Sequence, residues 1–403
     1  MMYGTPDFPV EEFRMLTYKN TIASCFVGYI VQAIVNNFVP LLFVTFQNTY
    51  GIPLSQITLL ITFNFVVQIL TDLVAAKYVD RIGYRAGMVL AHVFAALGLA
   101  GLTVLPEVMN PFTGILLAVM IYAVGGGLLE VLVSPVMESC PTDNKETAMS
   151  LLHSFYCWGH VSVVLISTVF FRFADIENWK VLALVWALIP VCNGLVFLKT
   201  PMASLMEEGD TGMTFGQLFR NGTFWWLLIM MVCSGASEHS VAEWASAFAE
   251  QGLGISKTLG DLAGPMSFAV CMGIARLIYG KYGENIPLDK FMKGSTILCV
   301  AAYLLISLSP WPVLSLAGCA LCGLSVGIMW PGSFSTAASS LRTGGTAMFA
   351  LLALAGDVGC GGGPTLVGMV SDALDGDLKK GILAAIVFPA VMAVCLFGRK
   401  KRT

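Results

Sequence analysis

The chain has 403 residues, of which 57% are hydrophobic and 12% charged, and its formal net charge is −3 at pH 7. Soluble domains carry about 25% charged residues, so a chain this apolar must have a lipid bilayer as its solvent. The charge balance excludes the basic character of nucleic-acid-binding proteins. Eleven cysteines are scattered as single small residues, mostly in apolar stretches, so neither a disulfide framework nor a zinc site is expected.

Twelve apolar stretches are long enough to span a membrane, which takes about 20 residues in a helix. They cover residues 18–46, 54–76, 86–106, 112–137, 147–171, 179–198, 223–249, 258–281, 289–308, 311–338, 346–371 and 379–397. The connections are short except for residues 199–222, which contain charges and glycines. We therefore predict an all-α membrane protein of two six-helix bundles, residues 1–198 and 223–403, joined by a cytoplasmic linker at 199–222.

The lysines and arginines predict the orientation of these spans. If the N-terminus is cytoplasmic, 17 of the 22 fall in cytoplasmic segments and 5 in external ones. Cytoplasmic loops of membrane proteins carry such an excess. The N-terminal residues lack the charge pattern of a signal peptide, so the first span is expected to be a helix of the mature protein. We expect a multi-pass protein of a bacterial-type inner membrane with both termini in the cytoplasm.

The two halves repeat each other at an offset of about 200 residues. The second span ends in AKYVDRIG (76–83) and the eighth in GKYGENIP (280–287). The fourth span contains GLLEVLVSP (127–135) and the tenth GLSVGIMWP (323–331). Both repeats hold six spans, so they share one orientation. Parallel repeats of this kind occur in transporters whose halves rock around a site at the membrane midplane.

Glu130 lies in the middle of the apolar stretch YAVGGGLLEVLVSPVMESC, whose other carboxylate, Glu138, lies near its end. In the aligned repeat it lies opposite Val326, so a scaffold role common to both halves would not need it. A charge at the bilayer centre costs about 2.5–3.5 kcal/mol on insertion scales, and a neutral carboxyl costs less. Such a group can take up a proton on one side of the membrane and release it on the other. The alternative is a structural carboxyl that is hydrogen-bonded to a neighbouring helix.

The seventh span, SGASEHSVAEWASAFAE, is the most polar of the twelve. His239 and Glu243 are four residues apart and should share one helix face, whereas Glu238 and Trp244 lie elsewhere on the helix. An acid, an imidazole and an indole beside a cavity would suit a polar solute with hydroxyl groups. Alternatively, this end of the helix is solvated in an outer vestibule.

Three further ionisable residues are candidates away from the ends of the predicted spans. Asp357 precedes a glycine run at 361–363, and His153 and His160 lie seven apart on one face of the fifth span. Each histidine could equally be a hydrogen-bonded interior residue. The glycines at 125–127 and 361–363 would allow close helix approach.

Enzymatic chemistry and resident cofactors are not expected. The sequence has no metal-ligand spacing, no phosphate-binding Gly-x-x-x-x-Gly-Lys-Ser/Thr loop and no nucleophile–base constellation that stands out. We therefore predict no catalytic residues, no bound metal and no cofactor.

The segment AAKYVDRIGYRAG (75–87) resembles the loop between helices 2 and 3 of the major facilitator superfamily. Asp80, Arg81, Gly83 and Arg85 match its Asp-Arg-x-Gly-x-Arg pattern. The resemblance implies that Asp80, Arg81 and Arg85 hold the two halves together when the cytoplasmic side is closed. A positive-inside anchor would explain the arginines equally well.

Within that superfamily the chain is most similar to the fucose/galactose/glucose–proton symporter branch. Leu129-Glu130 and Pro135 keep the spacing of its fourth helix, where the resemblance implies a glutamate for proton coupling and sugar binding. An Asn-Asp pair of the branch's first helix corresponds to Asn36-Asn37, so its second acid is absent.

Two further helices contribute to this similarity. The paired asparagines and the glutamine of the branch's fifth helix correspond to Ser150, His153 and Tyr156, ahead of Gly159. The seventh span looks like the Gly-x-Glu…Trp segment of many bacterial permeases of this group. A sugar or sugar-like solute is the substrate that the similarity implies.

We therefore expect a monomeric secondary transporter, surrounded by membrane lipid, that carries a small polar solute by proton-coupled symport. Glu130 would carry the proton, although sodium is an open alternative. The expected solute contacts are Asn36, Asn37, His153, Tyr156, Glu238, His239, Glu243, Trp244 and Asp357. The rival hypotheses are a proton-driven exporter of amphipathic compounds, favoured by 20 methionines and 25 phenylalanines, and a non-transporting membrane receptor or scaffold.

Overall fold

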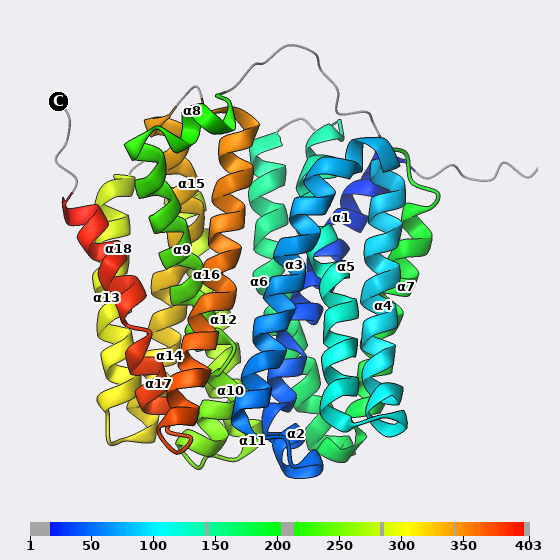
Figure 1. Ribbon diagram of the computed structural model, residues 1–403, viewed down its shortest axis with the longest axis vertical. Coiled ribbons are helices and arrows are strands. Elements are labelled where there is room, and N and C mark those ends of the chain that lie inside the picture. The colour runs from blue at the N-terminus through cyan, green and yellow to red at the C-terminus, as the bar shows by residue number, and fades with distance from the viewer. Residues whose placement is uncertain (1–16, 142–144, 203–212, 283–285, 342–343, 399–403) are drawn as a thin grey trace, which may run out of the picture.

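The computed structural model describes residues 17–141, 145–202, 213–282, 286–341 and 344–398. The described chain is helical throughout its regular elements and forms two bundles that lie side by side (Figure 1). The first bundle contains α1 (Tyr18–Asn37), α2 (Phe43–Tyr50), α3 (Leu54–Ile82), α4 (Tyr84–Val108), α5 (Pro111–Ser139), α6 (Lys145–Ala174) and α7 (Trp179–Phe197). The short helix α8 (Phe215–Phe219) lies within the linker, at one end of the molecule.

The second bundle is built from shorter pieces. It contains α9 (Gly222–Ala242), α10 (Ala245–Ala247), α11 (Lys257–Asp261), α12 (Ser267–Tyr282), α13 (Leu288–Leu308), α14 (Pro312–Val326), α15 (Met329–Ser340), α16 (Gly345–Ala373), α17 (Leu378–Ala384) and α18 (Val387–Gly398). The successive pieces α14 and α15, and α17 and α18, each continue one predicted span after a short break.

Eleven segments of the described chain are long and apolar enough to cross a membrane. They agree with eleven of the twelve predicted spans. The remaining predicted span, the seventh, corresponds to α9 with α10 and runs beside α16 in Figure 1. Its last turns carry Ser237, Glu238, His239 and Ser240, which lower its hydropathy and mark it as the polar helix of the second bundle.

The first and seventh spans are interrupted at corresponding places. The first breaks into the 3₁₀ turn η1 (Val39–Leu42) at Pro40, because proline has no N–H to continue the α-helical hydrogen bonds. The seventh breaks after Ala242 and resumes at Ala245. The π-helical turn η3 (Phe248–Gly252) follows it directly. These breaks were not predicted from the sequence.

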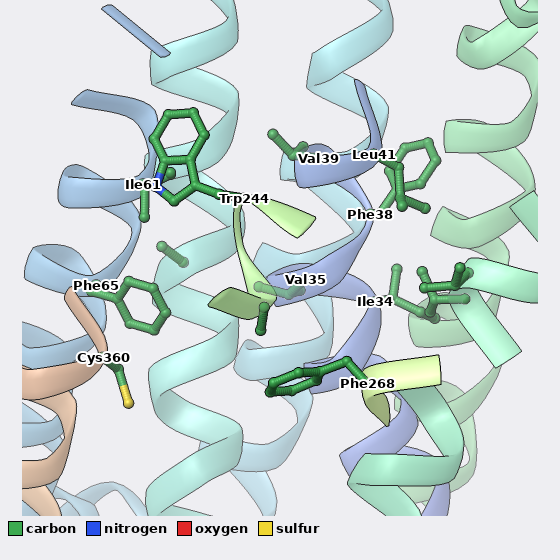
Figure 2. Packing of buried hydrophobic residues seen from close by; sticks show 14 of the residues in the cluster. Ile34, Val35, Phe38, Val39, Leu41, Ile61, Phe65, Trp244, Phe268 and Cys360 are labelled. Atoms are coloured by element: carbon green, nitrogen blue, oxygen red, sulfur yellow. The ribbon is translucent and has the colours of Figure 1, made fainter. Parts of the chain in front are cut away.

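The bundles meet mainly through two helices of the first bundle. α3 packs against α16, and α6 packs against α11, the π-helical turn η4 (Leu262–Met266) and α12. η1 also packs against α10. Figure 2 shows buried side chains of both bundles in one cluster, which contains Ile61 and Phe65 of α3 together with Trp244 of the second bundle. Trp244 is fully buried, lies 5.5 Å from the ring of Phe43, and donates its indole N–H to the carbonyl oxygen of Pro364.

The end of the molecule that holds α2, α10 and α11 is closed by polar contacts across the interface. The ammonium group of Lys257 in α11 donates to the carbonyl oxygen of Leu41 at 2.5 Å and lies 3.1 Å from Asp261. Thr62 and Thr365 share a hydrogen bond of 2.7 Å between α3 and α16. Asp261 is only 1% exposed, so Lys257 both neutralises a buried carboxylate and joins the bundles.

Replacing Lys257 with methionine is expected to loosen this closed end. Removing one partner of a buried ion pair leaves an uncompensated charge, at a cost of roughly 3–5 kcal/mol. Amide hydrogen exchange in η1 and α11 should accelerate, and adding Asp261→Asn should recover part of the protection.

The control for this experiment is Lys293→Met. Lys293 pairs with the exposed Asp289 inside the second bundle, so its loss should leave the exchange rates unchanged. Equal effects of the two lysine substitutions would contradict a role for Lys257 in closing this end.

Candidate functional site

Glu130 on α5 points toward the neighbouring helices of the interface. Its carboxylate accepts a hydrogen bond of 2.9 Å from Nε2 of Gln32 on α1. Carboxylate oxygens of Glu130, Asp72 on α3 and Asp357 on α16 all lie within 4.8 Å of one another. The cluster therefore joins two acids of the first bundle to one acid of the second.

A glycine on α5 makes this arrangement possible. Gly127 is one turn before Glu130 on the same helix face, and a Cβ atom there would lie 2.9 Å from an oxygen of Asp72 and from the carbonyl oxygen of Gln68. Only glycine lets α3 approach this closely. The run at 125–127 thus packs helices closely, as predicted, and sets the distance between Asp72 and Glu130.

Asp72 was not among the candidates from the sequence. It is 8% exposed and occupies the same face of α3 as Asn64 and Gln68, because the three residues follow one another at intervals of four. That spacing inside an apolar span is the sequence signal that would have identified it. One oxygen of Asp72 is buried without a hydrogen-bond partner in the described part of the chain.

The two neighbouring asparagines of α1 face different helices. The side-chain oxygen of Asn36 accepts hydrogen bonds from Gln68 at 2.9 Å and from Asn64 at 3.4 Å. Asn37 instead donates to Ala33 of its own helix at 2.9 Å and lies 3.5 Å from the hydroxyl of Tyr156 on α6. Asn36 therefore belongs to the polar stripe of α3 that leads to the acids, and Asn37 faces α6.

The polar end of α9 is buried rather than solvated. Nδ1 of His239 lies 3.2 Å from Glu243, which confirms that the two share a helix face, and Glu243 is 3% exposed. The His239 imidazole also meets the ring of Phe65 on α3 edge-on at 5.1 Å. Glu238 lies on another face, 3.8 Å from the guanidinium of Arg276.

The histidines of the first bundle are all engaged by neighbours or buried. His153 on α6 lies 3.4 Å from the hydroxyl of Tyr29, which also bonds Ser134 at 3.0 Å. His160 is 3% exposed. His92 has an Asn193 nitrogen 2.8 Å from its Nε2 and is an interior residue of the bundle, away from the acids.

The loop that resembles the superfamily motif lies partly outside the described side chains. Nothing is described of the side chains of Asp80 and Arg81. Arg85 donates to the carbonyl oxygens of Phe197 and Leu198 at the end of α7, at 3.1 and 2.7 Å. In this structure Arg85 therefore binds within the first bundle.

The acid cluster offers only oxygen atoms. Oxygen donors suit a proton or a hard cation, whereas transition metals favour imidazole and thiolate ligands. Three ionised carboxylates this close would repel one another in a medium of low dielectric constant. The described arrangement therefore requires a proton or a cation among Asp72, Glu130 and Asp357.

Two helical bundles that meet at buried acids and amides define a multi-pass membrane transporter rather than an enzyme. Residues 25–364 match the sequence profile of the Major Facilitator Superfamily, and the chain belongs to that family. No curated protein sequence matches the chain closely enough to identify a relative.

Solved structures share the fold at low sequence identity. A bacterial homologue of the human lysosomal transporter Spinster, in an inward-facing conformation, aligns with a TM-score of 0.74 at 15% identity, over 94% of this chain and 96% of its own. The Escherichia coli fucose:proton symporter FucP aligns with a TM-score of 0.65 at 19% identity, over 95% and 99%. The nucleoside transporter NupG aligns with a TM-score of 0.76 at 11% identity, over 94% and 99%.

Proposed function

We propose that this transporter carries a small polar solute, a sugar or sugar-like metabolite, by symport with protons. The observation that carries the proposal is the acid cluster, in which Asp357 of the second bundle meets Asp72 and Glu130 of the first. The fold likeness to a fucose:proton symporter and to a nucleoside transporter is consistent with a solute rich in hydroxyl groups.

The cluster can couple proton binding to the rocking of the bundles. When the bundles approach as described, the three acids need a bound proton, since their negative charges would otherwise repel. When the bundles separate at the cluster, Asp357 moves away from Asp72 and Glu130. Water can then reach the three carboxyl groups. A carrier couples only what it binds differently in its two states, and this interface supplies such a difference.

The polar residues around the cluster are proposed as solute contacts. From the first bundle these are Asn36, Asn37, His153 and Tyr156. From the second bundle they are Glu238, His239, Glu243, Trp244 and Asp357. Amide and hydroxyl groups can donate to or accept from a sugar hydroxyl, and carboxylates can accept from one. Trp244 is buried between the bundles here, so it would meet solute only after they separate.

We further propose that residues 1–198 and 223–403 move as the two bundles, with 199–222 as a cytoplasmic linker. Asp80, Arg81 and Arg85 would close the cytoplasmic side in the opposite state, where Arg85 would leave the end of α7. Both termini would then lie in the cytoplasm of a cell bounded by this inner membrane. The carrier would function as a monomer.

The test is solute uptake by the purified protein in proteoliposomes. An imposed pH gradient, alkaline inside, should drive accumulation of labelled fucose, galactose or glucose above the equilibrium level. Accumulation driven by a sodium gradient instead would identify sodium as the coupling ion, which the oxygen-only cluster also fits. Expulsion of amphipathic dyes with no sugar uptake would support the exporter and overturn the proposal.

A further inference from the structure

Arg276 is a buried cation that the proton mechanism does not use. It lies in the predicted span 258–281 and within α12, and its side chain is only 17% exposed. Placing an arginine inside a membrane protein is costly, so it is expected to have a partner and a function.

A glycine on the neighbouring helix orients the guanidinium. Gly327 follows the end of α14, and a Cβ atom there would lie 2.8 Å from Ala275 and 2.9 Å from the carbonyl oxygen of Met272. This close approach brings the Gly327 carbonyl oxygen to 3.2 Å from Nε of Arg276. This hydrogen bond through Nε restricts the orientation of the guanidinium, and the two Nη groups keep their own N–H donors.

The nearby carboxylate of Glu238 does not form close hydrogen bonds with these Nη groups. Nη2 lies 3.8 Å from Glu238 and 3.8 Å from the sulfur of Met272. Charge-assisted N–H···O bonds measure about 2.7–2.9 Å, and arginine commonly binds a carboxylate through two of them. Glu238 therefore balances the charge of Arg276 without forming that bidentate pair.

The first bundle places hydrogen-bonding groups opposite Arg276. α12 packs against α6, where a Cβ atom at Gly273 would lie 3.7 Å from Cys157. Arg276 is three residues further along the same face, within electrostatic range of Tyr29, Tyr156 and His153. A solute held here would contact both bundles, as alternating access requires.

We propose that Arg276 binds the carboxylate of the solute, so that the substrate is a hydroxylated monocarboxylate such as a sugar acid rather than a neutral sugar. The fork of the guanidinium takes the carboxylate, and Tyr29, His153 and Tyr156 take the hydroxyls. The inference rests on the proposed function, since it names the chemical class of that same solute.

Thermal unfolding of the purified protein with matched compounds tests the inference. The pairs are D-glucuronate with D-glucose, D-galacturonate with D-galactose, and D-gluconate with D-sorbitol, all at equal ionic strength. At least one acid should raise the Tm by several degrees, while its neutral partner should change the Tm no more than sodium chloride does. Binding by neutral partners alone, or no response to any acid, overturns the inference.

Variants assign the effect to Arg276. Arg276→Gln should lower the affinity for the acid at least tenfold. Arg276→Lys should lower it less, since lysine keeps the charge but lacks the paired N–H donors of the guanidinium. The double variant Arg276→Gln with Glu238→Gln removes both charges and guards against misfolding from an unpaired Glu238. Lys293→Gln, at an exposed ion pair, is the control and should respond like the unaltered protein. Unchanged acid affinity in the double variant overturns the role of Arg276.

The outcomes separate this inference from the proposed function. Neutral sugars that bind and follow a pH gradient would leave proton symport intact and exclude the sugar acid. Acids that bind through Arg276 but accumulate without any proton gradient would confirm the inference and refute proton coupling.

Discussion

Glu130→Gln is expected to abolish uphill transport while leaving solute exchange intact. Glutamine keeps the size of the side chain and can still bond Gln32, but it cannot release a proton. Accumulation driven by a pH gradient should fall roughly tenfold or more, because the proton no longer distinguishes the two states of the carrier. Exchange of labelled for unlabelled solute needs no net proton movement and should continue.

The same two assays on Asp72→Asn and Asp357→Asn establish whether the cluster acts as a unit. If the acids share one proton, each substitution should impair accumulation, and their effects should not add. Glu107→Gln is the control, since Glu107 is exposed and pairs with Lys180 far from the interface. Full uphill transport by the Glu130 variant would show that the proton is carried elsewhere.

The architecture was predictable because lipid imposes length and hydropathy on every span. Eleven of the twelve predicted spans agree with the structure for that reason. Glu130 was predictable for a related reason, since a lone carboxyl in an apolar run is costly. The contact of Glu130 with Asp357 could not be predicted, because no local pattern relates residues so far apart in the chain.

Two residues were missed for the same physical reason. Asp72 and Arg276 both lie toward the ends of their spans, where a charge is usually solvated or bound to lipid headgroups. Both are buried here because α3 and α12 form the interface, so a charge at that depth faces protein rather than water. The regular spacing of Asn64, Gln68 and Asp72 was a usable signal, whereas Arg276 had none.

The break in the seventh span also had no sequence signal. Pro40 explains the break in the first span, but residues 243–245 contain neither proline nor glycine. The structure places Trp244 at this break, packed on Phe43 beside the other break. Packing between the two bundles, rather than local helix propensity, is therefore what distinguishes this position.

Gly359→Ala is expected to destabilise the second bundle. Gly359 and Gly363 form a Gly-x-x-x-Gly pair on α16, the arrangement that lets two membrane helices approach closely. A Cβ atom at Gly359 would lie 2.1 Å from the carbonyl oxygen of Val232 on α9, and backbone cannot rotate away as a side chain can. Overpacking of this kind costs about 1–3 kcal/mol, so the Tm of the purified protein should fall by several degrees.

The neighbouring glycine provides the matched control. Gly362 is exposed, and nothing lies within 4 Å of the Cβ atom that alanine would add there. Gly362→Ala should therefore keep the Tm and, by removing backbone freedom from the unfolded chain, could raise it slightly. Because Asp357 lies two residues before Gly359, the Gly359 variant should also lose proton-driven accumulation. Equal stability of the two alanine variants would mean that α9 and α16 pack less closely than described, and that the position of Asp357 does not depend on Gly359.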